Sequence, residues 1–296
     1  MFRAHAPVAA FVPKPVASRS QRPWSDGASP SLSTLYVSHK PFVFGLTDVG
    51  KTRTRNEDSW SSVTARGIAV VADGMGGHPG GDVASRIAAD TAARILGDEL
   101  GHGARHGEGR EERLSAAMHR SVLSAHEAIR ARGEAEAELD GMGTTLTAIA
   151  VDQESGLFVL GNVGDSRGYR FRGGELTRLT KDDTWVQERI DARQLTPEQA
   201  RRHPFAHLLT QCLGLEDVPK PRITEGSVED GDVYLLCTDG LVGMIEEGEL
   251  ARILADGLRA SSDSAGDRTL RALVDAANAA GGFDNITAVL VTISIK

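Results

Sequence analysis

Carboxylates recur at the ends of the apolar runs in this sequence. Asp73 directly follows GIAVVA, Asp239 follows DVYLLC after one residue, Asp165 lies just past GLFVLGNV, and Asp284 comes just before NITAVLV. A single Asp-Gly pair is most simply a turn. Several carboxylates beside a core are different, because an unpaired charge there is costly. Such a set must either raise its pKa values or bind cations.

The other side chains narrow the choice of cation. The stretch RNEDSW adds Glu57 and Asp58 to the set, whereas the two cysteines, Cys212 and Cys237, lie far apart and form no CxxC. No His or Cys lies at ligand spacing. Ligands that are all oxygen suit Mg²⁺ or Mn²⁺, held octahedrally with several waters. The sequence therefore predicts a hard-metal site and supports neither a thiolate zinc site nor a disulfide framework.

Residues 45–52, GLTDVGKT, match the phosphate-binding loop of nucleotide hydrolases. That loop must lead into a packed helix, but RTRNEDSW follows Thr52 and has no apolar stripe. The short segment before the strand at 67–72 cannot hold a helix and its return to the sheet. DGMG and TKDD (180–183) match GTPase motifs, but such four-residue matches arise easily by chance in a chain rich in Gly and Asp. We reject the nucleotide hydrolase and predict a turn at Gly50.

The carboxylates need strands to position them, and these are predicted from short β-branched or apolar runs. Helices are predicted from apolar residues at helical spacing, and in 81–100 the stripe is Val83, Ile87, Ala88, Thr91, Ile95 and Leu96. The predicted strands are 42–47, 67–72, 144–152, 156–163, 167–171, 232–237 and 285–295, and the helices are 81–100, 111–132, 247–257 and 267–280. Strands in hairpin-like succession predict an α+β domain with largely antiparallel sheets covered by helices. The polar segment 181–210, inserted between strands, is predicted to be a partly helical surface flap.

Composition limits the partners and the compartment. The chain has 296 residues, 40% hydrophobic, enough for a full-sized core. The whole chain has a net charge of −8, and residues 1–40 have a net charge of +4. The remaining residues therefore carry −12, and a domain this acidic is a poor general nucleic-acid binder. Residues 1–40 are rich in Pro, Ser and Ala, and we expect either a disordered extension or residues upstream of the true start. No apolar run is long enough for a membrane span, and the cysteine usage favours the cytoplasm.

Six segments together resemble one known family. They are TDVGKTRTRNED, ADGMGGHPGGDVAS, GMGTTLTA, NVGDSRGYRFRGGELTRLTKDDTWVQ, LLCTDGL and GGFDNIT. In this order they resemble the PPM-type (type 2C) metal-dependent Ser/Thr protein phosphatases, in their bacterial form, from about Phe42 to Ile295. The resemblance implies an α+β fold with a central antiparallel β-sandwich flanked by helices on both faces, in a phosphatase domain at 41–296.

The resemblance also implies roles for individual residues at a binuclear Mn²⁺ or Mg²⁺ site. Asp73 would bridge two tightly bound ions, and Asp239 and Asp284 would complete the shell of one. Glu57 and the carbonyl of Gly74 would serve the other, largely through waters, with Asp58 in support. Asp165, with Asp239, matches the ligands of a third, weaker ion. Arg53 matches the residue that holds the substrate phosphate.

The implied activity is hydrolysis of phosphoserine and phosphothreonine in proteins. A water or hydroxide between two cations about 3.5–4 Å apart attacks phosphorus directly, with no phospho-enzyme. Two cations and the Arg53 guanidinium offset the charge on the phosphoryl oxygens. We expect a cytoplasmic signal-transduction enzyme, a monomer, whose partners are phosphoproteins and a cognate bacterial Ser/Thr kinase that it opposes.

The chain departs from the eukaryotic members of this family at one position. Met75 stands where they have a His proposed as general acid, as in many bacterial members. His78 either donates the proton or packs against or caps the following helix, and a metal-bound water is the preferred donor. The flap cations either steer phosphopeptides or form a solvated face: Arg189, Arg193, Arg201, Arg202 and His203.

A rival hypothesis is a pseudophosphatase that uses the same fold to bind a partner. Loss of a bridging Asp or of the phosphate-binding Arg would favour it. Arg53, Asp73, Asp239 and Asp284 are all present, so an active enzyme is expected.

Overall fold

The computed structural model describes residues 38–75, 80–101, 109–259 and 264–295. Its β-strands are β1 (His39–Asp48), β2 (Asp58–Val63), β3 (Ile68–Asp73), β4 (Leu146–Asp152), β5 (Leu157–Val163), β6 (Arg167–Arg172), β7 (Glu175–Arg178), β8 (Arg222–Ser227), β9 (Val233–Cys237) and β10 (Ile286–Ile295). Its α-helices are α1 (Gly81–Gly101), α2 (Arg110–Ala135), α3 (Trp185–Asp191), α4 (Pro197–Arg201), α5 (Asp239–Val242), α6 (Glu247–Leu258) and α7 (Ala265–Ala279). Single 3₁₀ turns lie at Thr64–Arg66 and Ala137–Leu139.

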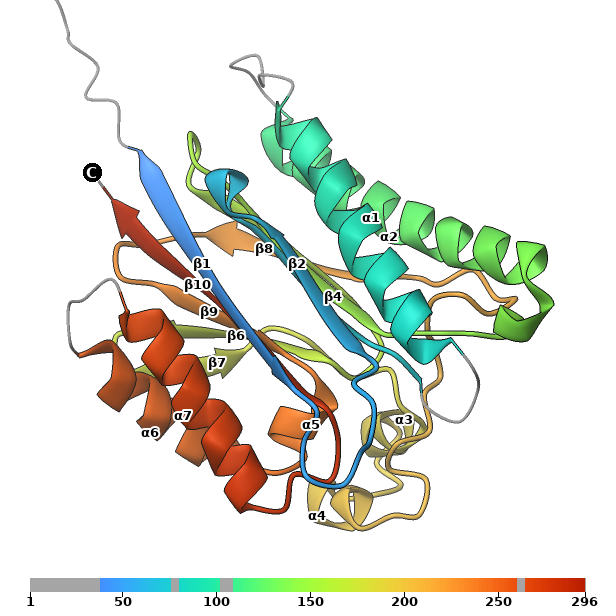
Figure 1. Ribbon diagram of the computed structural model, residues 1–296. Helices are drawn as coiled ribbons and strands as arrows, with labels where there is room; N and C mark the ends of the chain where they lie inside the picture. Colours follow the sequence, from blue (N-terminus) through green and yellow to red (C-terminus); the bar gives the residue numbers. More distant parts are fainter. Residues whose placement is uncertain (1–37, 76–79, 102–108, 260–263, 296) are drawn as a thin grey trace, which may run out of the picture. The chain divides into compact units, whose positions relative to one another are not determined.

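The strands form two five-stranded sheets in which every neighbouring pair is antiparallel. The first has the order β1-β10-β9-β6-β7 and the second the order β2-β3-β4-β5-β8. β1 and β10 pair along their whole length, from His39 opposite Ile295 to Asp48 opposite Ile286. Figure 1 shows this pair as the blue and red strands that lie side by side.

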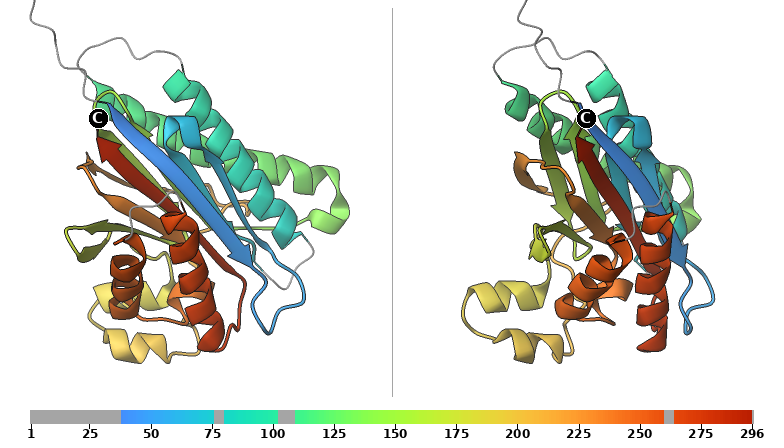
Figure 2. Two further views of the ribbon diagram at one scale, coloured as in Figure 1. Left: turned by 60° about the vertical axis from the view of Figure 1, so that its left-hand side comes forward. Right: turned by 90° about the vertical axis from the view of Figure 1, so that its left-hand side faces the viewer.

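Three apolar clusters separate four layers of structure. One lies between α1, α2 and the second sheet, one between the two sheets, and one between the first sheet and α6 and α7. In Figure 1 and in the left view of Figure 2, α1 with α2 and α6 with α7 lie on opposite sides of the sheets. This is the α+β sandwich, with helices on both faces, that the sequence predicted.

Strand β3 packs against both of its neighbouring layers. Ile68 and Val70 face the helices, whereas Ala69 and Val71 face the other sheet, and all four are fully buried. A strand buried on both faces has no polar side, so it reads as a continuous apolar run rather than an alternation. The same property made most of the central strands visible in the sequence.

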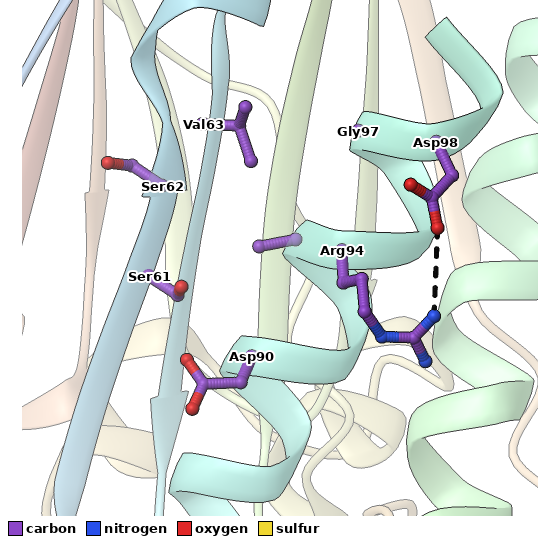
Figure 3. Close-up of a pocket in the computed structure, with 8 residues that line it drawn as sticks. Ser61, Ser62, Val63, Asp90, Arg94, Gly97 and Asp98 are labelled. Atoms are coloured by element: carbon purple, nitrogen blue, oxygen red, sulfur yellow. Dashed lines mark ion pairs between the residues drawn. The ribbon is translucent and has the colours of Figure 1, made fainter. Parts of the chain in front are cut away.

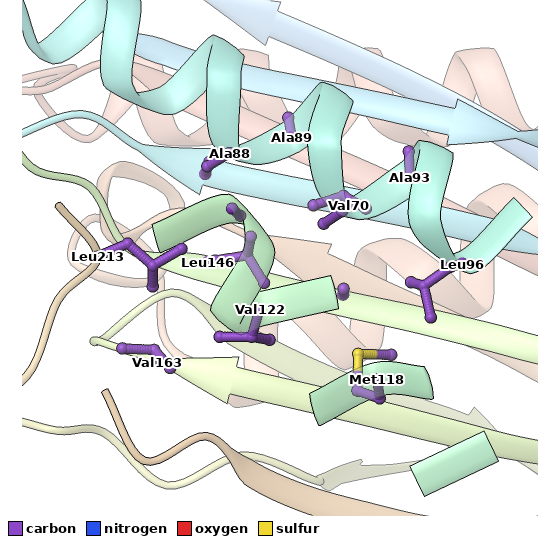
Figure 4. Packing of buried hydrophobic residues seen from close by; sticks show 14 of the residues in the cluster. Val70, Ala88, Ala89, Ala93, Leu96, Met118, Val122, Leu146, Val163 and Leu213 are labelled. Carbon is purple, nitrogen blue, oxygen red and sulfur yellow. The ribbon is translucent and has the colours of Figure 1, made fainter. Parts of the chain in front are cut away.

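Helix α1 differs from its predicted stripe. Ala88 and Leu96 are in the core, but Val83 and Ile87 lie at its margin, and the fully buried line also includes Ala84 and Ala92. Figure 4 shows Ala88, Ala89 and Ala93 of α1 in one cluster with side chains of β3, β4 and α2. Because α1 packs against a helix and a sheet together, small side chains are needed where the backbones come closest. The predicted positions Thr91 and Ile95 are only partly buried.

One predicted boundary also differs. His39 and Lys40 belong to β1, so strand pairing begins inside the stretch expected to be extension. Residues 1–37 lie outside the described residues. The segment 181–210 lies between β7 and β8 and contains α3 and α4, and its ends meet at a bridge between Thr184 and Leu209.

Within the described part of the chain, no helix combines the length and hydropathy that a membrane span requires.

Candidate metal centre

The predicted carboxylates come from both sheets and meet at their shared end. Asp58 begins β2 and is paired directly with Asp73, which ends β3. Asp239 follows β9 as the first residue of α5, and Asp284 lies just before β10. The Asp73 and Asp239 side chains are close enough to affect each other's pKa, and Asp58 lies in the electrostatic field of Asp239 and Asp284.

Two glycines make this approach possible. A Cβ atom at Gly240 would lie 1.9 Å from the carbonyl oxygen of Asn285, so α5 rests on the loop that carries Asp284. A Cβ atom at Gly74 would lie 2.2 Å from the carbonyl oxygen of Gly81 and 2.5 Å from that of Glu57. The Cα atom of Gly74, whose carbonyl is a predicted ligand, is therefore packed against the backbone of two neighbouring segments and leaves no room for a side chain.

Glu57 is fixed through its backbone. Its carbonyl accepts hydrogen bonds from the N–H of Gly74 at 3.2 Å and from the hydroxyl of Ser85 at 2.6 Å, while its N–H donates to the Oδ1 of Asn285 at 2.9 Å. The amide nitrogen of Asn285 donates to the carbonyls of Val49 and Arg55, both at 2.9 Å. Asn285 thus organises the whole loop that delivers Arg53 and Glu57, a role that the sequence analysis missed although Asn285 lies in the FDNIT segment.

Burial and mutual repulsion raise several pKa values at the site. Burial, followed by the charges of Asp58 and Asp239, raises the pKa of Asp73 well above its usual range. Burial raises the pKa of Asp58 to about 7, with contributions from the charges of Asp239 and Asp284 and against the hydrogen bonds of Thr238 and Thr287. Burial also raises the pKa of Asp165 to about 8, with contributions from the charges of Asp239 and Asp182.

Asp239 is the exception among these carboxyl groups. Burial alone would raise its pKa, but the interactions with His207 and Asp73 and the charge of Arg53 outweigh burial, and the net pKa is lowered. His207 Nδ1 lies 3.7 Å from Asp239 Oδ2, so we treat their contact as one between charges rather than a hydrogen bond. His207 belongs to the 181–210 segment, and no sequence pattern had marked it.

Arg53 already binds a carboxylate of the site. Its Nη2 lies 2.7 Å from Asp284 Oδ2, and its side chain is 44% exposed. The guanidinium therefore lies beside the carboxylates and remains open to solvent. His78, the possible proton donor, lies outside the described residues.

The donor set fits a hard divalent cation in two respects. Every side chain that the sequence predicted as a ligand is a carboxylate, and the Oδ1 atom of Asp58 is buried without a hydrogen-bond partner. Among the described residues, however, no three His, Cys, Asp or Glu side chains are arranged to hold an ion as they stand. The carboxylates of the described residues are thus neighbours that do not converge on one point.

The rejected alternatives find no support in the described structure. The N–H groups of Lys51 and Thr52 donate to the carbonyl of Gly282, at 2.8 and 3.2 Å, and Gly50 has a φ of +77°. The segment is the predicted turn, and its N–H groups are not available to a phosphate. Cys212 and Cys237 are buried, and burial raises the pKa of the first thiol to about 11 and that of the second to about 12.

A groove of about 440 Å³ between β2 and α1 lies apart from these carboxylates (Figure 3). Ser61, Ser62 and Asp90 line it, together with Arg94 and Asp98, which form an ion pair at 3.7 Å. None of the predicted site residues borders this groove.

Comparison with known proteins gives one consistent result. The protein phosphatase 2C family matches residues 50–275. The serine/threonine protein phosphatase PstP of Mycobacterium tuberculosis is 38% identical over 248 residues, which are 83% of this chain and 44% of that relative. The serine/threonine phosphatase Stp of Listeria innocua is 34% identical over 83% of this chain and 93% of its own length.

A solved structure extends the likeness to three dimensions. The catalytic domain of PstP in complex with two manganese ions superposes with a TM-score of 0.71 at 33% identity, over 87% of this chain and all of that domain. The chain therefore spans less than half the length of full-length PstP but the whole of its catalytic domain.

Proposed function

Because this chain belongs to the protein phosphatase 2C family, we propose that it is a metal-dependent phosphatase acting on phosphoserine and phosphothreonine in proteins. The observation that carries the proposal is the meeting of Asp58, Asp73, Asp239 and Asp284 at one end of two sheets. Four carboxylates so close together are costly unless cations bind them. The manganese-bound relative supports Mn²⁺ or Mg²⁺ as those cations.

Each carboxylate has a distinct proposed role. Asp73 bridges two ions, Asp239 and Asp284 complete the shell of one, and Glu57 with the Gly74 carbonyl serves the other. Asp58 supports this set, with Thr238 donating to its Oδ2 at 2.8 Å and so orienting the carboxylate. Asp165 lies near enough to Asp239 for their charges to interact, which supports a separate, weaker third site that these two residues share.

When bound, divalent cations acidify water and neutralise charge on phosphoryl oxygens. We propose that a water held between two of them attacks the phosphorus directly, with no phospho-enzyme. Neither buried thiol competes with it as a nucleophile. Arg53 has a planar guanidinium that can bind two phosphoryl oxygens at once. Its contact with Asp284 keeps it beside the cluster.

Residue 75 is Met, so its side chain cannot donate a proton to the leaving group. The N–H of Met75 donates to the carbonyl of Gly143 at 3.0 Å, and a Cβ atom at Gly143 would lie 2.2 Å from the Met75 methyl group. Met75 is thus packed against a neighbouring loop rather than being free to move. We propose a solvent molecule as the proton donor, with His78 as the alternative.

The wider biological setting rests on the relatives. Bacterial relatives named serine/threonine phosphatases support phosphoprotein substrates. We also propose a signalling role in opposition to a Ser/Thr kinase. We further propose that the enzyme is a cytoplasmic monomer and that residues 1–37 are not part of the catalytic domain. Arg189 contacts Glu188 and Arg201 contacts Glu246, which favours a solvated face over substrate steering for these two flap cations.

The proposal is tested with a phosphothreonine peptide and p-nitrophenyl phosphate. We expect turnover of both with Mn²⁺, none after chelation with EDTA, and full recovery when Mn²⁺ is restored. Iodoacetamide should have little effect because both thiols are buried. A folded protein that binds phosphopeptides without turning them over in Mn²⁺ would support the pseudophosphatase instead.

A further inference from the structure

The turn that carries Asp165 is attached on its inner side to the backbone of Asp73. Gly164 has a φ of +100°, and a Cβ atom there would lie 2.6 Å from the Thr145 side chain. The hydroxyl groups of Ser166 and Thr145 are 2.8 Å apart, and Thr145 Oγ1 accepts a hydrogen bond from the N–H of Asp73 at 3.0 Å. The position of this turn is therefore tied to that of the central carboxylate.

Asp183 holds the outer side of the same turn. Its Oδ2 accepts a hydrogen bond from the N–H of Gly164 at 3.2 Å, and its own N–H donates to the carbonyl of Gly164 at 2.9 Å. Arg222, in β8, donates from Nε to Asp183 Oδ1 at 2.9 Å. The Asp183 side chain is only 1% exposed and Gly164 is buried, so solvent has little access to the hydrogen bond between them, whereas the Arg222 side chain is 49% exposed.

Asp183 also lies where the two ends of the 181–210 flap meet. Its carbonyl accepts a hydrogen bond from the N–H of Thr210 at 2.8 Å. The next residue, Thr184, forms a bridge with Leu209, and the N–H of Trp185 donates to the carbonyl of Leu208 at 2.8 Å. One buried residue therefore contacts the Asp165 turn, the flap entry, the flap exit and β8.

We propose that Asp183 is a positioning residue that holds the Gly164–Asp165 turn against the carboxylate cluster and couples that turn to the flap. The proposal rests on the proposed phosphatase function only for its kinetic consequence. Removing the carboxylate leaves the buried Gly164 N–H without its partner and releases the Arg222 guanidinium to solvent, so the turn loses this outer support. Asp165 is then free to leave the position at which it faces Asp239.

Hydrogen exchange of the amides in residues 164–166 tests the positioning directly and needs no activity. In Asp183→Ala these amides should exchange about tenfold faster, the factor that one hydrogen bond to a charged group supplies. Asp183→Asn should fall between wild type and Ala, because a neutral oxygen still accepts from Gly164 but more weakly. Exchange at 164–166 equal to that of wild type in both variants would overturn the proposal.

Asp232→Asn is the matched control. Asp232 is fully buried and paired with Arg172 at 2.6 Å, but it precedes β9 whereas Asp239 follows that strand, so it lies at the opposite end. Its loss should leave exchange at 164–166 unchanged, and equal acceleration in this variant would reduce the Asp183 effect to a general loss of stability. Should Asp183→Ala fail to fold, the Asn variant decides by the same comparison.

A double-mutant cycle tests whether Asp183 affects catalysis through Asp165. At saturating Mn²⁺, Asp165→Ala and Asp183→Ala should each lower kcat on p-nitrophenyl phosphate, and the double variant should lose no more than Asp165→Ala alone. Losses that multiply would contradict action through Asp165. If Asp165→Ala keeps full kcat, the exchange measurement decides the positioning claim. A wild-type protein without Mn²⁺-dependent turnover would refute the proposed function and leave the exchange result intact.

Discussion

Asp58 combines burial with an incomplete set of hydrogen bonds. Asp58 is 8% exposed, its Oδ2 accepts a hydrogen bond from the Thr238 hydroxyl at 2.8 Å, and its Oδ1 has no hydrogen-bond partner. Burial raises its pKa to about 7, so the folded chain holds a proton there that the unfolded chain releases near its usual pKa of about 4. The Asp58 carboxyl group therefore contributes least to the stability of the metal-free protein at neutral pH and above.

The sign of this linkage gives a stability prediction. Between about pH 4 and pH 7 the folded state binds more protons than the unfolded state, so the contribution of Asp58 to stability falls as pH rises. In EDTA, Asp58→Asn should match wild type near pH 4 and exceed it by roughly 3 kcal/mol at pH 7. Thermal or urea unfolding across this pH range measures the difference.

The control for this prediction is again Asp232→Asn, because the Asp232 carboxylate is satisfied by Arg172 and by the hydroxyl of Tyr234 at 3.1 Å. That variant should be less stable than wild type at pH 7. An Asp58→Asn variant that is destabilised at pH 7 in EDTA would show that burial and the neighbouring charges do not make the ionised Asp58 carboxylate unfavourable.

Arg53 is expected to act on substrate rather than on the fold. Arg53→Ala should raise KM for p-nitrophenyl phosphate roughly tenfold or more, because a charge-assisted hydrogen bond to phosphate is lost. Arg53→Lys should restore little, since an ammonium is a point charge without the guanidinium fork. Steady-state kinetics at saturating Mn²⁺ measure both variants, and an unchanged KM in the Ala variant would remove Arg53 from the phosphate site.

At the scale of elements, the sequence was most informative where both faces of a strand are buried. The apolar runs of β3, β5 and β9 predicted strands within one or two residues of their observed ends. β2, β7 and β8 were missed, because DSWSSV, ELTR and RITEGS are polar and partly exposed. β2 and β8 are the outer strands of their sheet, and β7 is an outer strand of the other.

The composition of the site was predictable, but its internal contacts were not. Carboxylates at strand ends could be read from the chain one by one. The contacts that join them depend on residues far apart in sequence, such as Thr238 with Asp58 and Asn285 with Glu57. His207 was invisible for the same reason, because only the fold of the flap brings it to Asp239.

The junction of α5 with the Asp284 loop gives a prediction for an element. Gly240→Ala would place a methyl group 1.9 Å from the Asn285 carbonyl oxygen and should destabilise the protein by about 1–3 kcal/mol while weakening Mn²⁺ binding. Gly248→Ala is the control, because nothing lies within 4 Å of its added Cβ on α6, and it should be neutral or up to about 1 kcal/mol stabilising.

Calorimetric Mn²⁺ titration and thermal unfolding of both glycine variants test this junction. Equal stability and equal Mn²⁺ affinity in the two variants would show that the approach of α5 to the Asp284 loop is not needed.

At the scale of the whole molecule, the catalytic domain is expected to begin at β1. His39 pairs with Ile295, and the His39 ring contacts the carbonyl of Gln153 at 3.1 Å, so the strand is integrated from its first residue. Residues 1–37 lack periodic apolar positions from which a packed element could form.

A chain that starts at Ser38 should therefore keep its melting temperature within about 2 °C and its kcat on p-nitrophenyl phosphate. Differential scanning calorimetry and steady-state kinetics compare it with the full chain. A collapse of either quantity would show that the first 37 residues pack on the domain.

The central claim is that the carboxylates at the end of the two sheets form a binuclear metal centre, and Asp73 is its proposed bridge. The most direct measurement is a calorimetric Mn²⁺ titration of wild type and Asp73→Asn, with p-nitrophenyl phosphate turnover followed on the same samples. We predict that wild type binds at least two ions and that Asp73→Asn stays folded, loses the tight paired binding and has no turnover at any Mn²⁺ concentration. Turnover by Asp73→Asn near the wild-type rate would contradict the assignment of the centre.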